Sequence, residues 1–111
     1  MNQIERVRKM EELLNKAQDV IDRISVALEE NTVTDSLKNE YEDIQETILV
    51  LQNYYEGEEW KEDYELDSEG GFPPCLNRGV LSEDAVYDLL TDNDIIKDEL
   101  ELDWAFFITK N

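Results

Sequence analysis

The chain has 111 residues, of which 29 are acidic and 10 are basic, and its formal net charge at pH 7 is −19. This length fits one domain, and an apolar share of 41% is enough for one modest core. The excess of negative charge repels DNA, RNA and anionic membranes and attracts basic proteins and cations. We therefore expect no direct nucleic-acid binding and no membrane association.

Two patterns bear on the location of the protein. No run approaches the roughly 20 apolar residues that span a bilayer, and the start, MNQIERVRKM, lacks the apolar core of a signal peptide. Cys75 is the single cysteine, so it has no partner for an internal disulfide. We expect a cytoplasmic protein.

Apolar residues recur at alternating steps of three and four near the start of the chain, which predicts a helix over residues 4–29. The members of this series are Ile4, Val7, Met10, Leu14, Ala17, Ile21, Ile24 and Leu28. The same spacing predicts a second helix over residues 35–55. Thr32, Thr34 or Asp35 can cap this helix, and the short connection makes the two helices antiparallel neighbours.

A short third helix is expected over residues 58–68. Trp60 and Tyr64 stand four residues apart and therefore share one face of it, while acidic residues occupy the rest. The glycine pair at residues 70–71 ends this helix.

A fourth helix is expected over residues 82–93. Ser82 can act as its N-cap, and Glu83 and Asp84 fall in the first turn, where the helix dipole favours negative charge. These elements predict an all-α fold, in which a long antiparallel helical hairpin carries one or two short capping helices in a single domain over residues 1–111.

The last segment, residues 94–111, has a less definite pattern. Leu100, Trp104 and Ile108 fit both the alternation of a strand and the four-residue steps of a helix. Because a lone strand would have no partner within this chain, we favour a helix or an ordered tail packed on the hairpin.

The stretch EGEEWKEDYELDSEGG, at residues 56–71, is the most acidic part of the chain. We interpret its carboxylates mainly as the hydrated face of a short helix; a recognition surface for a basic partner and a weak divalent-cation site are the alternatives. A calcium loop that starts at Asp63 would need glycine and glutamate where Ser68 and Pro74 stand. We therefore assign no metal ligands and no cofactor.

Catalytic groups are scarce. The chain has no histidine, so Cys75 lacks the usual base of a nucleophile, and we expect it to be a small apolar filler. None of the four glycines forms a phosphate-binding loop. We therefore expect that the protein is not an enzyme.

The run PPCLNRGVLSEDAVYDLL, at residues 73–90, contains an arginine among carboxylates. In one interpretation Arg78 pairs with an acid such as Asp63 or Glu83, Gly79 can adopt a positive φ, and Trp60 and Leu81 fill the end of the hairpin. In the other, the same charged cluster is a recognition pocket.

The motifs YYEGEEW, at residues 54–60, and RGVLSED, at residues 78–84, resemble the bacterial family known as domain of unknown function 4298. The resemblance covers about residues 4–93. It implies a small soluble helical protein and no known activity, so no catalytic residues follow from it. The positions that match its motifs are Tyr54, Tyr55, Trp60, Arg78, Gly79, Ser82, Glu83 and Asp84.

We predict a non-catalytic protein–protein interaction module, and a homodimer is left open. The expected partner is a protein, for which a basic surface is one candidate. An acidic inhibitor that mimics nucleic-acid charge and a weak divalent-cation binder are the alternatives. The candidate interaction surface comprises Trp60, Asp63, Tyr64, Arg78, Glu83, Asp84, Trp104, Phe106 and Phe107.

Overall fold

The computed structural model describes residues 2–110, and the side chains of residues 2–100. Its elements are α1 (Gln3–Glu30), α2 (Asp35–Glu56), α3 (Glu58–Ser68), the short 3-10 helix η1 (Gly79–Leu81) and α4 (Glu83–Lys110). The described part of the chain contains helices and no strand, which confirms the all-α prediction.

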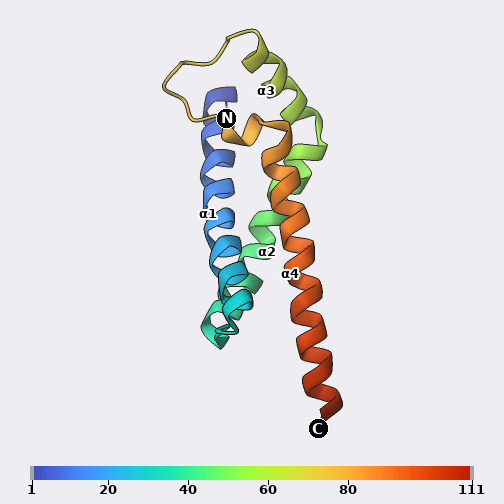
Figure 1. Ribbon diagram of the computed structural model, residues 1–111. Coiled ribbons are helices and arrows are strands. Elements are labelled where there is room, and N and C mark those ends of the chain that lie inside the picture. The colour runs from blue at the N-terminus through green and yellow to red at the C-terminus, as the bar shows by residue number, and fades with distance from the viewer. Residues whose placement is uncertain (1, 111) are drawn as a thin grey trace.

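The two long N-terminal helices form the expected antiparallel hairpin (Figure 1). Asn2 caps α1 through its side chain, and Asn31 ends it in the left-handed conformation, with φ of 61°. Of the three candidate caps for α2, Thr34 has the role, since its hydroxyl accepts a hydrogen bond from the backbone N–H of Leu37 at 3.1 Å. Residues 32–34 therefore act as the turn of the hairpin.

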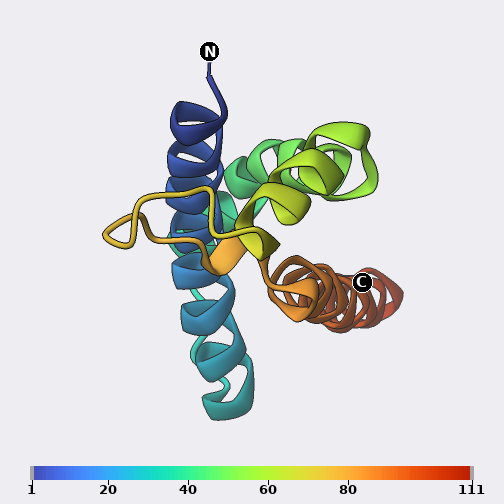
Figure 2. The same ribbon diagram turned by 90° about the horizontal axis from the view of Figure 1, so that it is seen from above.

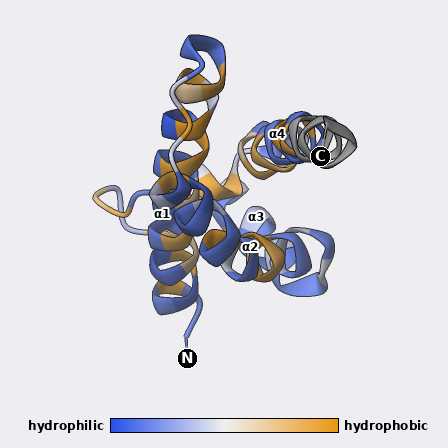
Figure 3. Ribbon diagram, turned by 90° about the horizontal axis from the view of Figure 1, so that it is seen from below, coloured by the Kyte–Doolittle hydropathy of each residue, from blue (hydrophilic) through white to orange (hydrophobic). Residues whose placement is uncertain are grey.

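The core lies where the apolar sides of α1, α2 and α4 meet. Ile21 and Ile24 of α1 and Leu51 of α2 are buried in one cluster, and Val86 and Leu89 bring the start of α4 into it. Seen from above, α1 crosses the direction of α4, while α2 and α4 lie on the same side of it (Figure 2). Figure 3 shows that these helices have one hydrophobic and one hydrophilic side, as the sequence spacing predicts.

The fourth helix is longer than expected. The predicted end at residue 93 is wrong, because α4 continues to Lys110 and its last turns extend beyond the hairpin turn (Figure 1). No glycine or proline occurs between Glu83 and Lys110 to stop it, and Ile96 remains buried in the core. The segment is helical rather than a strand, as favoured from the sequence.

The connection between α3 and η1 is held by two apolar side chains. Phe72 and Leu76 are buried, and Gly70 turns the chain with φ of 73°, a conformation that favours glycine. The expectation that Cys75 is an apolar filler is wrong: its side chain is exposed. The neighbouring Leu76 takes the buried place instead.

We predict that Leu51→Ala lowers the free energy of unfolding by about 2–5 kcal/mol, because it opens a cavity in the core. Leu49→Ala is the matched control on the same helix, since Leu49 is 56% exposed whereas Leu51 is fully buried. The control should change that free energy by less than about 0.5 kcal/mol. Urea denaturation followed by circular dichroism measures both, and equal losses would contradict the placement of α2.

Candidate functional site

A fully buried carboxylate joins α3 to the hairpin. Asp63 accepts hydrogen bonds from Arg6 Nε at 2.9 Å and from the Arg6 Nη2 at 2.7 Å. The hydroxyl of Tyr54 donates to it at 2.6 Å and the amide of Gln3 at 3.1 Å. We call Gln3, Arg6, Tyr54 and Asp63 the Asp63 cluster.

The ionisation of this cluster follows from its bonds. Burial raises the pKa of Asp63, but the hydrogen bonds from Arg6, Tyr54 and Gln3 outweigh it and hold that pKa below its ordinary value. The pKa of Tyr54 is raised by burial and by its bond to the carboxylate, so its hydroxyl keeps its proton. Asp63 is therefore an ionised carboxylate whose oxygens are already occupied, which suits it to fixing α3 in place.

This cluster differs from the surface role predicted for Asp63. The side chain is 0% exposed and faces Arg6, so it is not part of an open recognition surface. The buried position of Asp63 is hard to recognise from the sequence, because six other acidic residues occur between residues 56 and 67. The available signal is spacing, since Asp63 stands three residues after Trp60 and shares its docking side of the helix.

Three aromatic rings form a ladder beside the cluster. The rings of Tyr55 and Trp60 meet edge to face at 5.1 Å, and those of Trp60 and Tyr64 stack at 5.1 Å. Trp60 donates its indole N–H to the carbonyl of Val80 at 3.0 Å, and the hydroxyl of Tyr64 donates to Glu83 Oε1 at 2.9 Å. This last bond raises the pKa of Tyr64. Trp60, Tyr64 and Glu83, three residues of the candidate interaction surface, are thus brought together.

Arg78 pairs with an acid, as one interpretation predicted, but with neither of the two residues named as examples. Its guanidinium binds Asp67 at 2.8 Å, since Asp63, one turn earlier on α3, is turned inward to Arg6. Gly79 has no positive φ. Glycine is needed here because there is no room for a side chain: a Cβ at residue 79 would lie 2.9 Å from Glu11 Oε1. The other oxygen of Glu11 accepts a hydrogen bond from the backbone N–H of Val80 at 2.7 Å.

The remaining predicted surface residues do not join this group. Asp84 is exposed at the start of α4. The side chains of Trp104, Phe106 and Phe107 lie outside the described residues.

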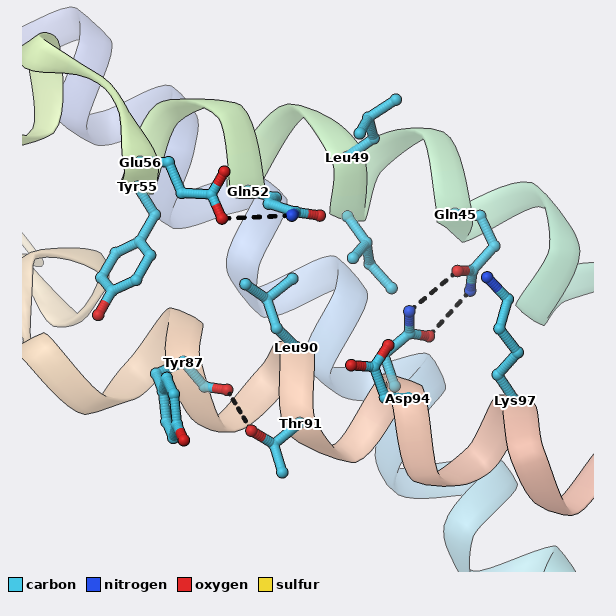
Figure 4. Close-up of a pocket in the computed structure, with 12 residues that line it drawn as sticks. Gln45, Leu49, Gln52, Tyr55, Glu56, Tyr87, Leu90, Thr91, Asp94 and Lys97 are labelled. Carbon is cyan, nitrogen blue, oxygen red and sulfur yellow. Dashed lines mark hydrogen bonds between the residues drawn. The ribbon is translucent and has the colours of Figure 1, made fainter.

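An open groove that sequence reasoning missed runs between α2 and α4, with a volume of about 600 Å³ (Figure 4). Two exposed apolar side chains flank it: Leu49 of α2 is 56% exposed and Tyr87 of α4 is 59% exposed. Ile48 and Leu90 also line it. We call this feature the α2–α4 groove, and its lining residues are Gln45, Ile48, Leu49, Gln52, Tyr55, Glu56, Tyr87, Leu90, Thr91, Asn93, Asp94 and Lys97.

A pair of amide side chains closes one end of this groove. Gln45 and Asn93 exchange two hydrogen bonds of 3.0 Å each, and Gln45 also donates to the carbonyl of Tyr41 at 3.0 Å. The hydroxyl of Tyr41 in turn donates to the carbonyl of Asn93 at 3.0 Å. The two hydrogen bonds between these side-chain amides form only when Gln45 and Asn93 face each other, so the pair fixes the register of α4 against α2.

The described residues contain neither a metal-binding cluster nor a membrane-spanning helix. Where side chains are described, no three carboxylate or cysteine groups gather as a metal site requires. No helix in the described part of the chain is long and apolar enough to cross a membrane.

We predict that Asp63→Asn lowers the free energy of unfolding by about 1.5–3 kcal/mol, because it weakens the charged hydrogen bonds at the buried end of Arg6, whose remaining close carboxylate partner is the exposed Glu59 at 2.6 Å. Glu40→Gln is the matched control, because it removes the carboxylate from a solvent-exposed ion pair, in which Arg23 and Glu40 are 3.0 Å apart. The control should lower the free energy of unfolding by less than about 1 kcal/mol. Denaturant unfolding measures both, and equal effects would show that Arg6 and Asp63 are not paired in the core.

The same pair predicts a pH dependence. Since the pKa of Asp63 is lower in the folded chain than its ordinary value near 3.8, its contribution is present above that value and is lost as the pH falls through the lowered one. The difference in free energy of unfolding between the natural chain and Asp63→Asn should therefore stay constant from neutral pH to about pH 5 and shrink at lower pH. A difference that grows on acidification would contradict this.

Comparison with known proteins bears on the family. No curated protein and no solved structure matches the chain. The sequence profile described as "Domain of unknown function (DUF4298)" matches residues 7–102, which includes the Asp63 carboxylate, the aromatic ladder and the α2–α4 groove. The match reaches further along α4 than the resemblance over residues 4–93 predicted. The chain belongs to this family, domain of unknown function 4298.

Proposed function

We propose that the protein is a non-catalytic interaction module that binds a basic segment of a partner protein in the α2–α4 groove. The observation that carries this proposal is the open groove of about 600 Å³, flanked by two apolar side chains that are more than half exposed. The proposal keeps the cytoplasmic location expected from the sequence.

The apolar surface of the groove favours an occupant. Leu49 of α2 and Tyr87 of α4 lie on opposite sides of the groove, and Leu90 lies between the two helices (Figure 4). Ile48 also lines the groove. Neighbouring apolar side chains gain free energy when a partner removes them from water, roughly 25 cal/mol per Å². Val50, although 44% exposed, is not part of the groove and has no such neighbours in it.

The charge around the groove favours a basic occupant. The helix Asp35–Glu56 and residues 83–100 together carry thirteen acidic side chains and two lysines. Two of these acids, Glu56 and Asp94, and one of the lysines, Lys97, line the groove itself, so its own charged side chains are acidic by one. A second copy would bring the same negative field to this face, whereas a basic segment would be attracted to it.

The Asp63 cluster supports a role without catalysis. Asp63 accepts four hydrogen bonds from Gln3, Arg6 and Tyr54, so it has no oxygen left to act as a general base. The raised pKa of Tyr54 keeps its hydroxyl protonated in the same way. The most buried ionisable group of the described residues is thus engaged in holding the helices together.

The test uses a display library of peptides tiled across the proteome of the source cell. Enriched peptides should carry net positive charge and apolar residues, and should bind Leu49→Asp/Tyr87→Asp at least about tenfold more weakly than the natural chain. The loss is expected even though the variant is more acidic, because the groove loses its apolar lips.

The control is Val26→Asp/Val50→Asp, which adds the same charge at two exposed apolar positions outside the groove. It should bind the peptides as the natural chain does. A protein that merely mimics nucleic-acid charge would not distinguish the two variants. Equal binding by both, or the absence of any enriched basic peptide, would contradict the proposal.

A further inference from the structure

The walls of the α2–α4 groove are two antiparallel helices. From Gln45 to Glu56 along α2 and from Tyr87 to Lys97 along α4, the lining residues span about three turns, or roughly 15 Å. Figure 4 shows the two helices side by side, with α1 behind the pair. An elongated segment laid along this groove would therefore contact both walls on the side opposite to α1.

We infer that the basic partner segment binds this groove as an amphipathic α-helix whose basic residues stand seven positions apart. This inference rests on the proposed function and names the form of the partner. The apolar face of the partner helix lies over Ile48 and Leu90, between Leu49 and Tyr87. Its basic residues meet Glu56 and Asp94.

A helix is favoured over an extended strand because of the backbone. A bound strand needs a sheet edge to pair its N–H and C=O groups, and the described residues contain no strand. The backbone groups of α2 and α4 are already bonded within their own helices. A helical partner satisfies its own backbone and needs only side-chain contacts from the groove.

The spacing of the basic residues follows from the two acids of the groove. Figure 4 places Glu56 on α2 and Tyr87 on α4 toward one end of the groove, on opposite walls, and Asp94 beside Gln45 toward the other end. Tyr87 and Asp94 are seven residues apart on α4, which is two turns of a helix. Two arginines seven positions apart on the partner helix are separated by the same two turns.

The amide pair adds a requirement at one end. Gln45 and Asn93 present polar atoms beside Asp94, whereas Ile48 and Leu90 are apolar. Asn93 is already buried, so the partner would meet the half-buried amide of Gln45, and an apolar residue over it would remove it from water without a new hydrogen bond. The partner helix should therefore be apolar along its middle and polar where it passes Asn93.

The test probe is a synthetic peptide of fourteen residues, with leucines at positions i, i+3, i+4 and i+7 and two arginines seven apart. A control peptide has the same composition, but its leucines are spread around the helix. The natural chain should bind the first peptide at least about tenfold more tightly by calorimetry. Circular dichroism should show a gain of helix on binding.

Two pairs of variants test the basic residues. Glu56→Gln/Asp94→Asn should weaken binding of the first peptide by about tenfold. Glu46→Gln/Asp88→Asn removes the same charge from exposed positions of the same helices outside the groove, and should leave the affinity nearly unchanged.

The outcomes separate this inference from the proposed function. If proteome peptides require the groove but the two synthetic peptides bind alike or without gain of helix, the helical partner is wrong and the interaction function stands. If neither kind of peptide requires the groove, both are wrong. Analytical ultracentrifugation of the natural chain should show a monomer; a dimer that Leu49→Asp/Tyr87→Asp dissociates would overturn the inference, because a second copy would then occupy the groove.

Discussion

The excess of negative charge constrains every contact between the helices. With 29 acidic and 10 basic residues, the helices can meet only along their narrow apolar sides, because a carboxylate taken out of water without a partner costs several kcal/mol. Asp63 is the one acidic side chain that is buried among the described residues, and Arg6 neutralises it. The core, the position of α3 and the open face of the molecule follow from this separation of charge from apolar surface.

Two polar contacts then decide how the apolar sides are aligned. The Asp63 cluster ties α3 to the start of α1 and the end of α2, while the pair of Gln45 and Asn93 sets α4 against α2. Because α1 takes the inner sides of α2 and α4, their outer sides remain open and form the groove. The same packing that stabilises the molecule therefore leaves the surface that the proposed function uses.

The local features were predictable from the sequence, and the long-range ones were not. The apolar spacing and the caps at Thr34 and Ser82 are local, so the helices and the hairpin followed from them. The full length of α4 could have been predicted, since nothing after Glu83 breaks a helix. The burial of Asp63 and its pairing with Arg6 join residues 57 apart in the chain, and the groove depends on the angle between two helices; neither leaves a local pattern.

The most direct test of the account is methyl-group NMR of the chain with the amphipathic basic peptide bound. We predict that the methyl signals of Ile48, Leu49 and Leu90 shift on binding, while those of Val26 and Val50, which are exposed outside the groove, stay in place. Shifts that concentrate at Val26 and Val50, or that spread evenly over the acidic helices, would show that charge alone attracts the peptide and would contradict the account.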